Sequence, residues 1–276
     1  MNSKGKERRL QVRTLFVSDI HLGFKRARTR ELLAFLHGID ADCIVLGGDI
    51  VDALSLAKRF YWTDEHTQVL RLLLARRRSG VRLVYLPGNH DAALSVFVEM
   101  LQGQIEVHRE WVYRTSRGER YLVLHGDQFD EAVDCPAWLY WIGDRLYEGT
   151  LLYNHRVNEL RHLFGMPYRP QTEGLKASIG TSARFIRRFE TIAAAGARDQ
   201  GYDGVICGHI HRANLCTIDG TVYANTGDWV ESCSALVETR AGEMQLLRWP
   251  HGAVATSRVT PLLADVALSH RTHIGL

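Results

Sequence analysis

Residues 42–49, DCIVLGGD, decide the fold, because an apolar run ends there in two glycines and a carboxylate. The run Cys43–Leu46 is too short for a helix and indicates a buried strand. Gly47 and Gly48 permit a tight turn that carries Asp49 just beyond the strand end. In α/β proteins, functional sites lie outside the carboxyl ends of strands. We therefore expect Asp49 to belong to such a site.

The same arrangement, an apolar run followed by polar side chains, recurs along the chain. The five polar motifs are Asp19-Ile20-His21, Gly47-Gly48-Asp49, Gly88-Asn89-His90-Asp91, His125-Gly126-Asp127 and Gly208-His209-Ile210-His211. Together they offer carboxylates, one amide and five imidazoles, a donor set that suits two divalent cations held side by side. Such a pair activates water and neutralises a phosphate. The motifs therefore predict hydrolysis of a phosphate ester or anhydride.

The remaining pattern predicts an α/β fold of two facing mixed sheets flanked by helices. Further strands are expected at residues 13–18, 82–86, 121–124 and 203–207, and helices at 29–36, 69–78 and 175–197. Four strands near the end, at 214–218, 221–224, 234–239 and 243–249, are expected to form one antiparallel meander, with turns at Asp219-Gly220 and Ala241-Gly242.

The length of 276 residues fits one domain, residues 1–276, with a helical insert at 134–170. The insert is rich in aromatic residues and interrupts the alternation of strands and helices. Two interpretations stay open for it: the aromatic side chains pack inward, or they form an apolar surface suited to a lipid tail.

Composition narrows the class of protein. The net charge of +3 is small, and we expect no nucleic-acid partner. The five cysteines are odd in number and lack CxxC spacing, which predicts reduced thiols rather than disulfides. No signal sequence and no apolar run long enough to cross a membrane is visible, so we expect a cytoplasmic protein.

The order D-x-H, G-G-D, G-N-H-D, H-G-D, G-H-x-H resembles the calcineurin-like metallophosphoesterase superfamily, from Asp19 to His211. Within it, the chain resembles the UDP-2,3-diacylglucosamine pyrophosphatase group of the lipid A pathway. The similar features are S-D-I-H-L at 18–22, the insert after H-G-D, and N-T-G-D-W at 225–229. His90 stands where that group carries arginine, which leaves a related phospholipid or a nucleotide as an alternative substrate.

The resemblance implies a role for each motif residue. The first metal would be bound by Asp19, His21 and His211, the second by Asn89, His125 and His209, and Asp49 would bridge both. Histidine ligands favour manganese, with iron, cobalt or zinc as alternatives. His90 would protonate the leaving group or bind a phosphate oxygen, and Asp91 would fix the tautomer of His90.

Three functions follow from this. The first is cleavage of UDP-2,3-diacylglucosamine, a nucleotide-linked glycolipid, to UMP and a lipid phosphate by a protein associated peripherally with the inner membrane face. The second is phosphodiester or phosphomonoester hydrolysis of another phospholipid or a soluble nucleotide. The third is a scaffold that keeps the fold without catalysis, which the complete ligand set disfavours.

Overall fold

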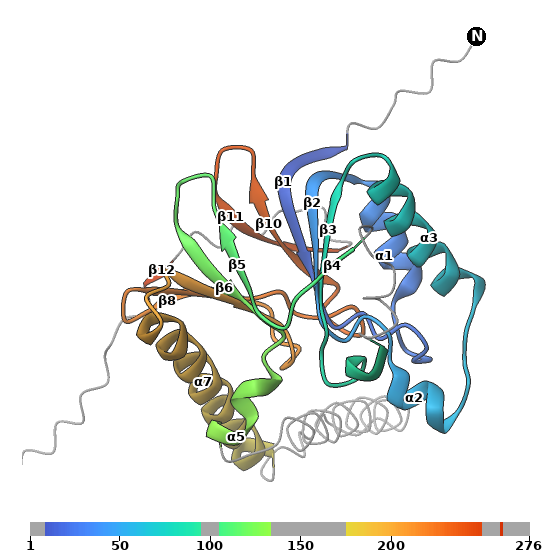
Figure 1. The fold of residues 1–276 in the computed structure, drawn as a ribbon. Coiled ribbons are helices and arrows are strands. Elements are labelled where there is room, and N and C mark those ends of the chain that lie inside the picture. Colours follow the sequence, from blue (N-terminus) through green and yellow to red (C-terminus); the bar gives the residue numbers. More distant parts are fainter. Residues whose placement is uncertain (1–8, 95–104, 134–174, 250–259, 262–276) are drawn as a thin grey trace, which may run out of the picture.

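The computed structural model describes residues 9–94, 105–133, 175–249 and 260–261. Two six-stranded mixed sheets face each other, and helices cover their outer faces (Figure 1). The strand order is β11-β10-β1-β2-β3-β4 in the first sheet and β12-β8-β9-β7-β6-β5 in the second. This αββα sandwich confirms the predicted fold class. The predicted insert, residues 134–170, lies outside the described residues.

The strands are β1 (Leu10–Val17), β2 (Ile39–Gly47), β3 (Arg82–Leu86), β4 (Glu106–Val107), β5 (Trp111–Arg114), β6 (Arg120–Val123), β7 (Gly204–Cys207), β8 (Asn214–Ile218), β9 (Thr221–Asn225), β10 (Ser234–Thr239), β11 (Met244–Arg248) and β12 (Thr260–Pro261). The helices are α1 (Thr29–His37), α2 (Ala53–Lys58), α3 (Asp64–Arg78), α5 (Asp130–Val133) and α7 (Leu175–Asp199), with 3-10 turns η1 (Ala92–Leu94) and η2 (Asp127–Phe129). None of the described helices has the length and apolar composition needed to cross a membrane.

Parallel pairing sets the direction of both sheets. In the first sheet β1 pairs with β2 and β2 with β3, all parallel, and in the second β6, β7 and β9 are parallel. The carboxyl ends of parallel strands lie at the same edge of a sheet. The loops after β1, β2, β3, β6 and β7, which carry the five polar motifs, therefore meet at one end of the sandwich.

The core has three apolar layers. Between the sheets, Phe16 and Val45 of the first sheet belong to one buried cluster with Val123 and Ile206 of the second. A second cluster joins α1 and α3 to the outside of the first sheet, and a third joins α7 to the outside of the second sheet. Strands buried on both faces lack an alternating pattern, which is why β2 appears in the sequence as a continuous apolar run.

The prediction of one C-terminal meander is wrong. β8 and β9 form a hairpin in the second sheet, whereas β10 and β11 form a hairpin in the first. The connection between the two hairpins crosses from sheet to sheet and is fixed by hydrogen bonds: Trp229 donates its N–H to the Asp19 carbonyl, and the Trp229 carbonyl accepts from Arg28. The predicted turns are present, and both Asp219 and Gly220 have the positive φ of a tight hairpin turn.

A buried carboxylate joins the two sheets at the end opposite the motif loops. Glu238 of β10 is fully buried and accepts from Arg13 Nη1 at 2.8 Å and from Ser116 N at 2.7 Å. The Tyr113 hydroxyl of β5 also donates to this carboxylate. Burial opposes ionisation, but these donors outweigh it and hold the pKa of Glu238 below its ordinary value.

We predict that Glu238→Ala destabilises the protein by roughly 3 kcal/mol, because it leaves buried donors without an acceptor. Urea unfolding followed by circular dichroism measures this free energy. Glu243→Ala removes an exposed glutamate beside the same hairpin and should change stability by no more than about 0.5 kcal/mol. Equal effects of the two substitutions would contradict the role given to Glu238.

Candidate metal centre

The motif side chains come together where the strands end. Asp19 and His21 follow β1, Asp49 follows β2, and His90 follows β3; from the second sheet, His125 follows β6 and the His209-Ile210-His211 segment follows β7. Six of them, without His209, form three groups whose ligand atoms lie within 4.8 Å of one another: Asp19, His21 and His211; His21, Asp49 and His90; and Asp19, Asp49 and His125.

The backbone of this region adopts an unfavourable conformation. Seven described non-glycine residues have positive φ, and five of them are motif residues: Asp19, His21, Asp49, His209 and His211. Each such residue costs on the order of 1–3 kcal/mol, and this strain concentrates at functional sites. The strand-end loops are thus held in conformations that the rest of the fold must enforce.

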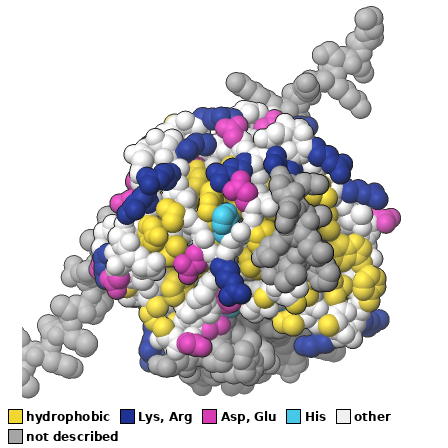
Figure 2. Space-filling view, viewed as in Figure 1, with side chains coloured by type: hydrophobic (Ala, Val, Ile, Leu, Met, Phe, Trp, Pro, Cys, Tyr) yellow, Lys and Arg dark blue, Asp and Glu magenta, His cyan; other side chains and the backbone are white. Residues whose placement is uncertain are grey.

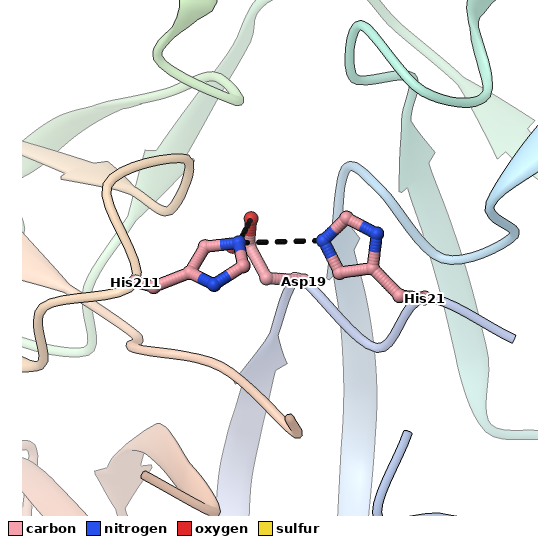
Figure 3. Close-up of side chains that lie close together, drawn as sticks. All are labelled: Asp19, His21 and His211. Atoms are coloured by element: carbon pink, nitrogen blue, oxygen red, sulfur yellow. Dashed lines mark hydrogen bonds and ion pairs between the residues drawn. The ribbon is translucent and has the colours of Figure 1, made fainter. Parts of the chain in front are cut away.

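The first group shows what its atoms can bind. Asp19 Oδ1 lies 3.2 Å from His211 Nε2, which lies 3.3 Å from His21 Nε2 (Figure 3). Because His21 Nδ1 lies against the Asp52 carboxylate at 3.3 Å, Nδ1 carries the proton and Nε2 presents its lone pair to His211. Two imidazole nitrogens and a buried carboxylate converge on one point here. This arrangement is better suited to binding a shared cation than to hydrogen bonds among the three groups.

Asp49 lies between the groups. Its Oδ2 is 3.4 Å from His125 Nε2 and 3.8 Å from His21 Nε2. Its Oδ1 accepts a hydrogen bond from the backbone N–H of His90 at 2.8 Å. His125 donates from Nδ1 to the Gly47 carbonyl at 2.9 Å, which turns its Nε2 toward Asp49. Asp49 thus contacts histidines of both sheets and can be shared by two cations.

Asn89 and His209 complete the set on the side of the second sheet. Asn89 Oδ1 lies 3.3 Å from His125 Nε2, so the amide oxygen faces the same space. The His209 ring lies 5.1 Å from the His125 ring, and its Nε2 contacts Asp130 Oδ1 at 2.9 Å. His209 is outside the three compact groups, and its Nδ1 is the ring nitrogen left for a ligand role.

The carboxylates and imidazoles of the site favour each other's charged forms. Burial opposes ionisation of Asp19, but the neighbouring His211 outweighs it and keeps the pKa of Asp19 below its ordinary value. In the same way, burial disfavours a charged His211, but Asp19 raises its pKa to about 9. Asp49 behaves like Asp19, and its pKa is lowered mainly by His125 against the effect of burial. The carboxylates therefore draw positive charge, and the oxygen and nitrogen donors fit divalent metal ions.

Two carboxylates outside the five motifs, Asp52 and Asp130, contact histidines of the site. Asp52 contacts His21 Nδ1 and, at 3.0 Å, His90 Nδ1, and it also caps α2 by accepting from Ser55 N at 2.8 Å. Asp130 is the partner of His209. Asp52 falls three residues after Asp49 and three before Ser55, a helix-capping pattern that could have drawn attention to it.

The role assigned to Asp91 needs correction. The carboxylate at His90 Nδ1 is Asp52, whereas Asp91 accepts the N–H groups of Gly88 and Ile50, both at 2.7 Å. Asp91 therefore ties the loop after β3 to the loop after β2. Burial and the nearby Asp49 raise the pKa of Asp91.

The comparisons with known proteins agree with this geometry. The family model described as calcineurin-like phosphoesterase matches residues 12–213, and the chain belongs to that family. Family membership and the His/Asp groups together define a metal-dependent phosphohydrolase. This confirms the predicted superfamily and reaction class, and it does not extend to the lipid A group. A comparison with curated proteins gives no match.

Solved structures with a similar fold include YfcE, a phosphoesterase from E. coli, with 14% identity, a TM-score of 0.43, and coverage of 85% of this chain and 97% of that one. An archaeal phosphodiesterase has 10% identity and a TM-score of 0.41 and covers 85% and 98%. Vacuolar protein sorting 29 from Cryptosporidium parvum has 13% identity and a TM-score of 0.39 and covers 85% and 95%.

Gly88 supplies a test of the close packing around Asp49. A Cβ at this position would lie 2.8 Å from both Asp49 N and His125 Cδ2. We predict that Gly88→Ala weakens metal binding by about 10–100-fold, because it displaces these groups. Gly196→Ala, in α7, places its Cβ at an ordinary 3.6 Å from Phe129 and should leave binding unchanged. Metal titration by calorimetry measures both, and unaltered affinity in Gly88→Ala would contradict the assignment.

Proposed function

We propose that the protein hydrolyses a phosphodiester or phosphate ester of a nucleotide or phospholipid, with His90 as the proton donor to the leaving group. The observation that carries this proposal is the position of His90. Its side chain is 31% exposed, whereas its neighbours Asp49 and His21 are at most 7% exposed. His90 therefore stands between the buried groups and solvent, where a leaving group would depart.

In this proposal each motif residue has one task. Asp19, His21 and His211 would hold one cation, Asn89, His125 and His209 would hold the other, and Asp49 would be shared by the two. Two divalent cations held there would supply a hydroxide at neutral pH and would neutralise charge on the phosphate. Asp52 and Asp130 orient His21 and His209 through their second ring nitrogens, as carboxylate partners of metal-binding histidines do.

The environment of His90 suits an acid. Burial lowers the pKa of His90, but its hydrogen bond to Asp52 and the charge of Asp49 outweigh this and raise it above the ordinary value. Asp52 and Asp49 therefore favour the protonated form of the imidazole. Since Asp52 holds Nδ1, the proton on Nε2 is the one available to a leaving oxygen.

We predict that His90→Gln lowers kcat by about 10²–10⁴-fold on a dinucleotide, whose leaving group is an alkoxide that needs a proton. The loss should be much smaller on bis(p-nitrophenyl) phosphate, because p-nitrophenolate leaves without protonation. Bound metal, measured by mass spectrometry, should not change. His37→Gln makes the same substitution on the exposed side of α1 and serves as the control.

An equal loss on both substrates would assign His90 to phosphate or metal binding instead of proton transfer. Absence of turnover in the metal-loaded wild type on every phosphate ester and anhydride tested would favour the scaffold interpretation and contradict the proposal.

A second candidate is cleavage of UDP-2,3-diacylglucosamine at the inner membrane face. Its support is apolar surface next to the site: Leu54 on α2 is 50% exposed and Phe60, just after α2, is 77% exposed, in a segment that begins at Asp52. Exposed apolar side chains beside a phosphohydrolase site suit a substrate with acyl chains.

The two candidates differ in one assay. If the glycolipid is the substrate, protein supplied with Mn²⁺ should release UMP from it in detergent at a turnover of about 1 s⁻¹ or better. Leu54→Ser with Phe60→Ser should then raise KM for the lipid and leave turnover of bis(p-nitrophenyl) phosphate unchanged. Turnover of the diester without UMP release would leave the first proposal and reject the second.

A further inference from the structure

A cavity of about 640 Å³ lies away from the metal centre, within the range of small-molecule sites. We call it the arginine cavity. Its lining is Arg13, Thr14, Asp42, Cys43, Arg82, Trp111, Val112, Tyr113, Arg114, Arg120 and Tyr202. These residues come from the middle of β1 and β2, the start of β3, β5 and β6, and, for Tyr202, the loop between α7 and β7. Since Arg13 precedes Asp19 by six residues of nearly extended chain, the two sites are roughly 20 Å apart.

Positive charge dominates this cavity. Four arginines line it: Arg82 is paired with Glu106 and Arg13 with Glu238, which leaves Arg114 and Arg120. The one lining carboxylate, Asp42, is itself paired with Arg240 at 2.7 Å. Arg114 and Arg120 form no ion pair with any carboxylate in the described part of the chain. Figure 2 shows several Lys and Arg side chains over the upper part of the molecule, with Asp and Glu side chains among them and hydrophobic side chains between them. An anion entering the cavity would meet the guanidinium of Arg114 and the donors of Arg120 that its bond to the Gly201 carbonyl does not use.

The floor of the cavity is rigid. Thr14 Oγ1 and the Tyr113 hydroxyl are hydrogen-bonded at 2.7 Å, and Tyr113 also contacts the fully buried Glu238. The bonds that Arg13 makes to Glu238 use only Nη1, so its Nε and Nη2 groups are left for another acceptor. A fixed floor with unused donors reduces the entropy cost of binding.

The walls carry aromatic rings positioned by guanidinium groups. Arg82 lies over the Trp111 ring at 5.1 Å, and Arg120 lies over the Tyr202 ring at 5.4 Å. Both rings are half-buried and line the cavity. Flat apolar surfaces next to arginines are the combination that binds a base together with its phosphate. The sequence did not indicate this cluster, because its members come from separated strands.

We propose that the arginine cavity binds a nucleoside monophosphate, with the phosphate at Arg114 and Arg120 and the base against Trp111 and Tyr202. This site is independent of the proposed function, because it shares no residue with the metal centre. The volume of about 640 Å³ fits one nucleotide unit.

The test is calorimetric titration of metal-free protein, in EDTA, with AMP, UMP, ribose 5-phosphate and inorganic phosphate. Removal of metal eliminates nucleotide binding at the metal centre. We expect one site per chain, with Kd of about 1 mM or tighter for the nucleotides and weaker binding of the two probes without a base. Arg114→Glu should weaken nucleotide binding at least about tenfold.

Arg117→Glu is the matched control, since it makes the same charge change on the same β5–β6 hairpin but outside the cavity. It should bind nucleotide like the wild type. Both variants alter exposed side chains and should keep the wild-type unfolding temperature. Equal effects of the two substitutions, equal affinity for inorganic phosphate, or binding only to an oligonucleotide would each overturn the proposal.

Discussion

The structure depends on two carboxylates, Asp19 and Asp49, which lie almost fully buried between two sheets. Among the described residues, the ion-pair partners of both carboxylates are histidines: His211 for Asp19, and His21 and His125 for Asp49. A buried negative charge must be compensated, and imidazoles that share their nitrogens with a cation compensate more completely than imidazoles alone. This requirement explains why histidines of both sheets meet at Asp49 and why their loops accept left-handed backbone conformations.

The rest of the fold is arranged to enforce that meeting. Parallel β1, β2 and β3 deliver three loops to one edge, and β6 and β7 deliver two more from the facing sheet. Asp91 ties two of these loops together, and the connection from β9 to β10 reaches Asp19 through the Trp229 N–H. At the opposite end, Glu238 joins the sheets, and its own backbone does not have a positive φ. The sandwich is therefore held by packing and a polar network at one end, which allows the other end to carry strain.

Much of this was predictable from the sequence, because strands buried on both faces appear as apolar runs and the polar motifs follow them directly. β4 and β5 were missed, since two and four residues give no periodic signal. The pairing of β10 with β1 could not be predicted from the sequence either, because pairing between strands that are distant in the chain depends on tertiary packing. At the site, most of the motif residues come together, but the carboxylate at His90 Nδ1 is Asp52 and not Asp91, to which the resemblance had given that role. Asp52 makes this contact because the loop that carries it lies beside both His21 and His90.

The most direct test of this account is the metal stoichiometry of the full chain. Protein reconstituted with Mn²⁺ and freed of excess ion should retain two metal ions per chain, measured by inductively coupled plasma mass spectrometry. Asp49→Ala should lose both ions while keeping its fold, since the shared carboxylate is what allows two cations to lie side by side. One ion or fewer in the wild type, or two ions in Asp49→Ala, would contradict the central role of Asp49.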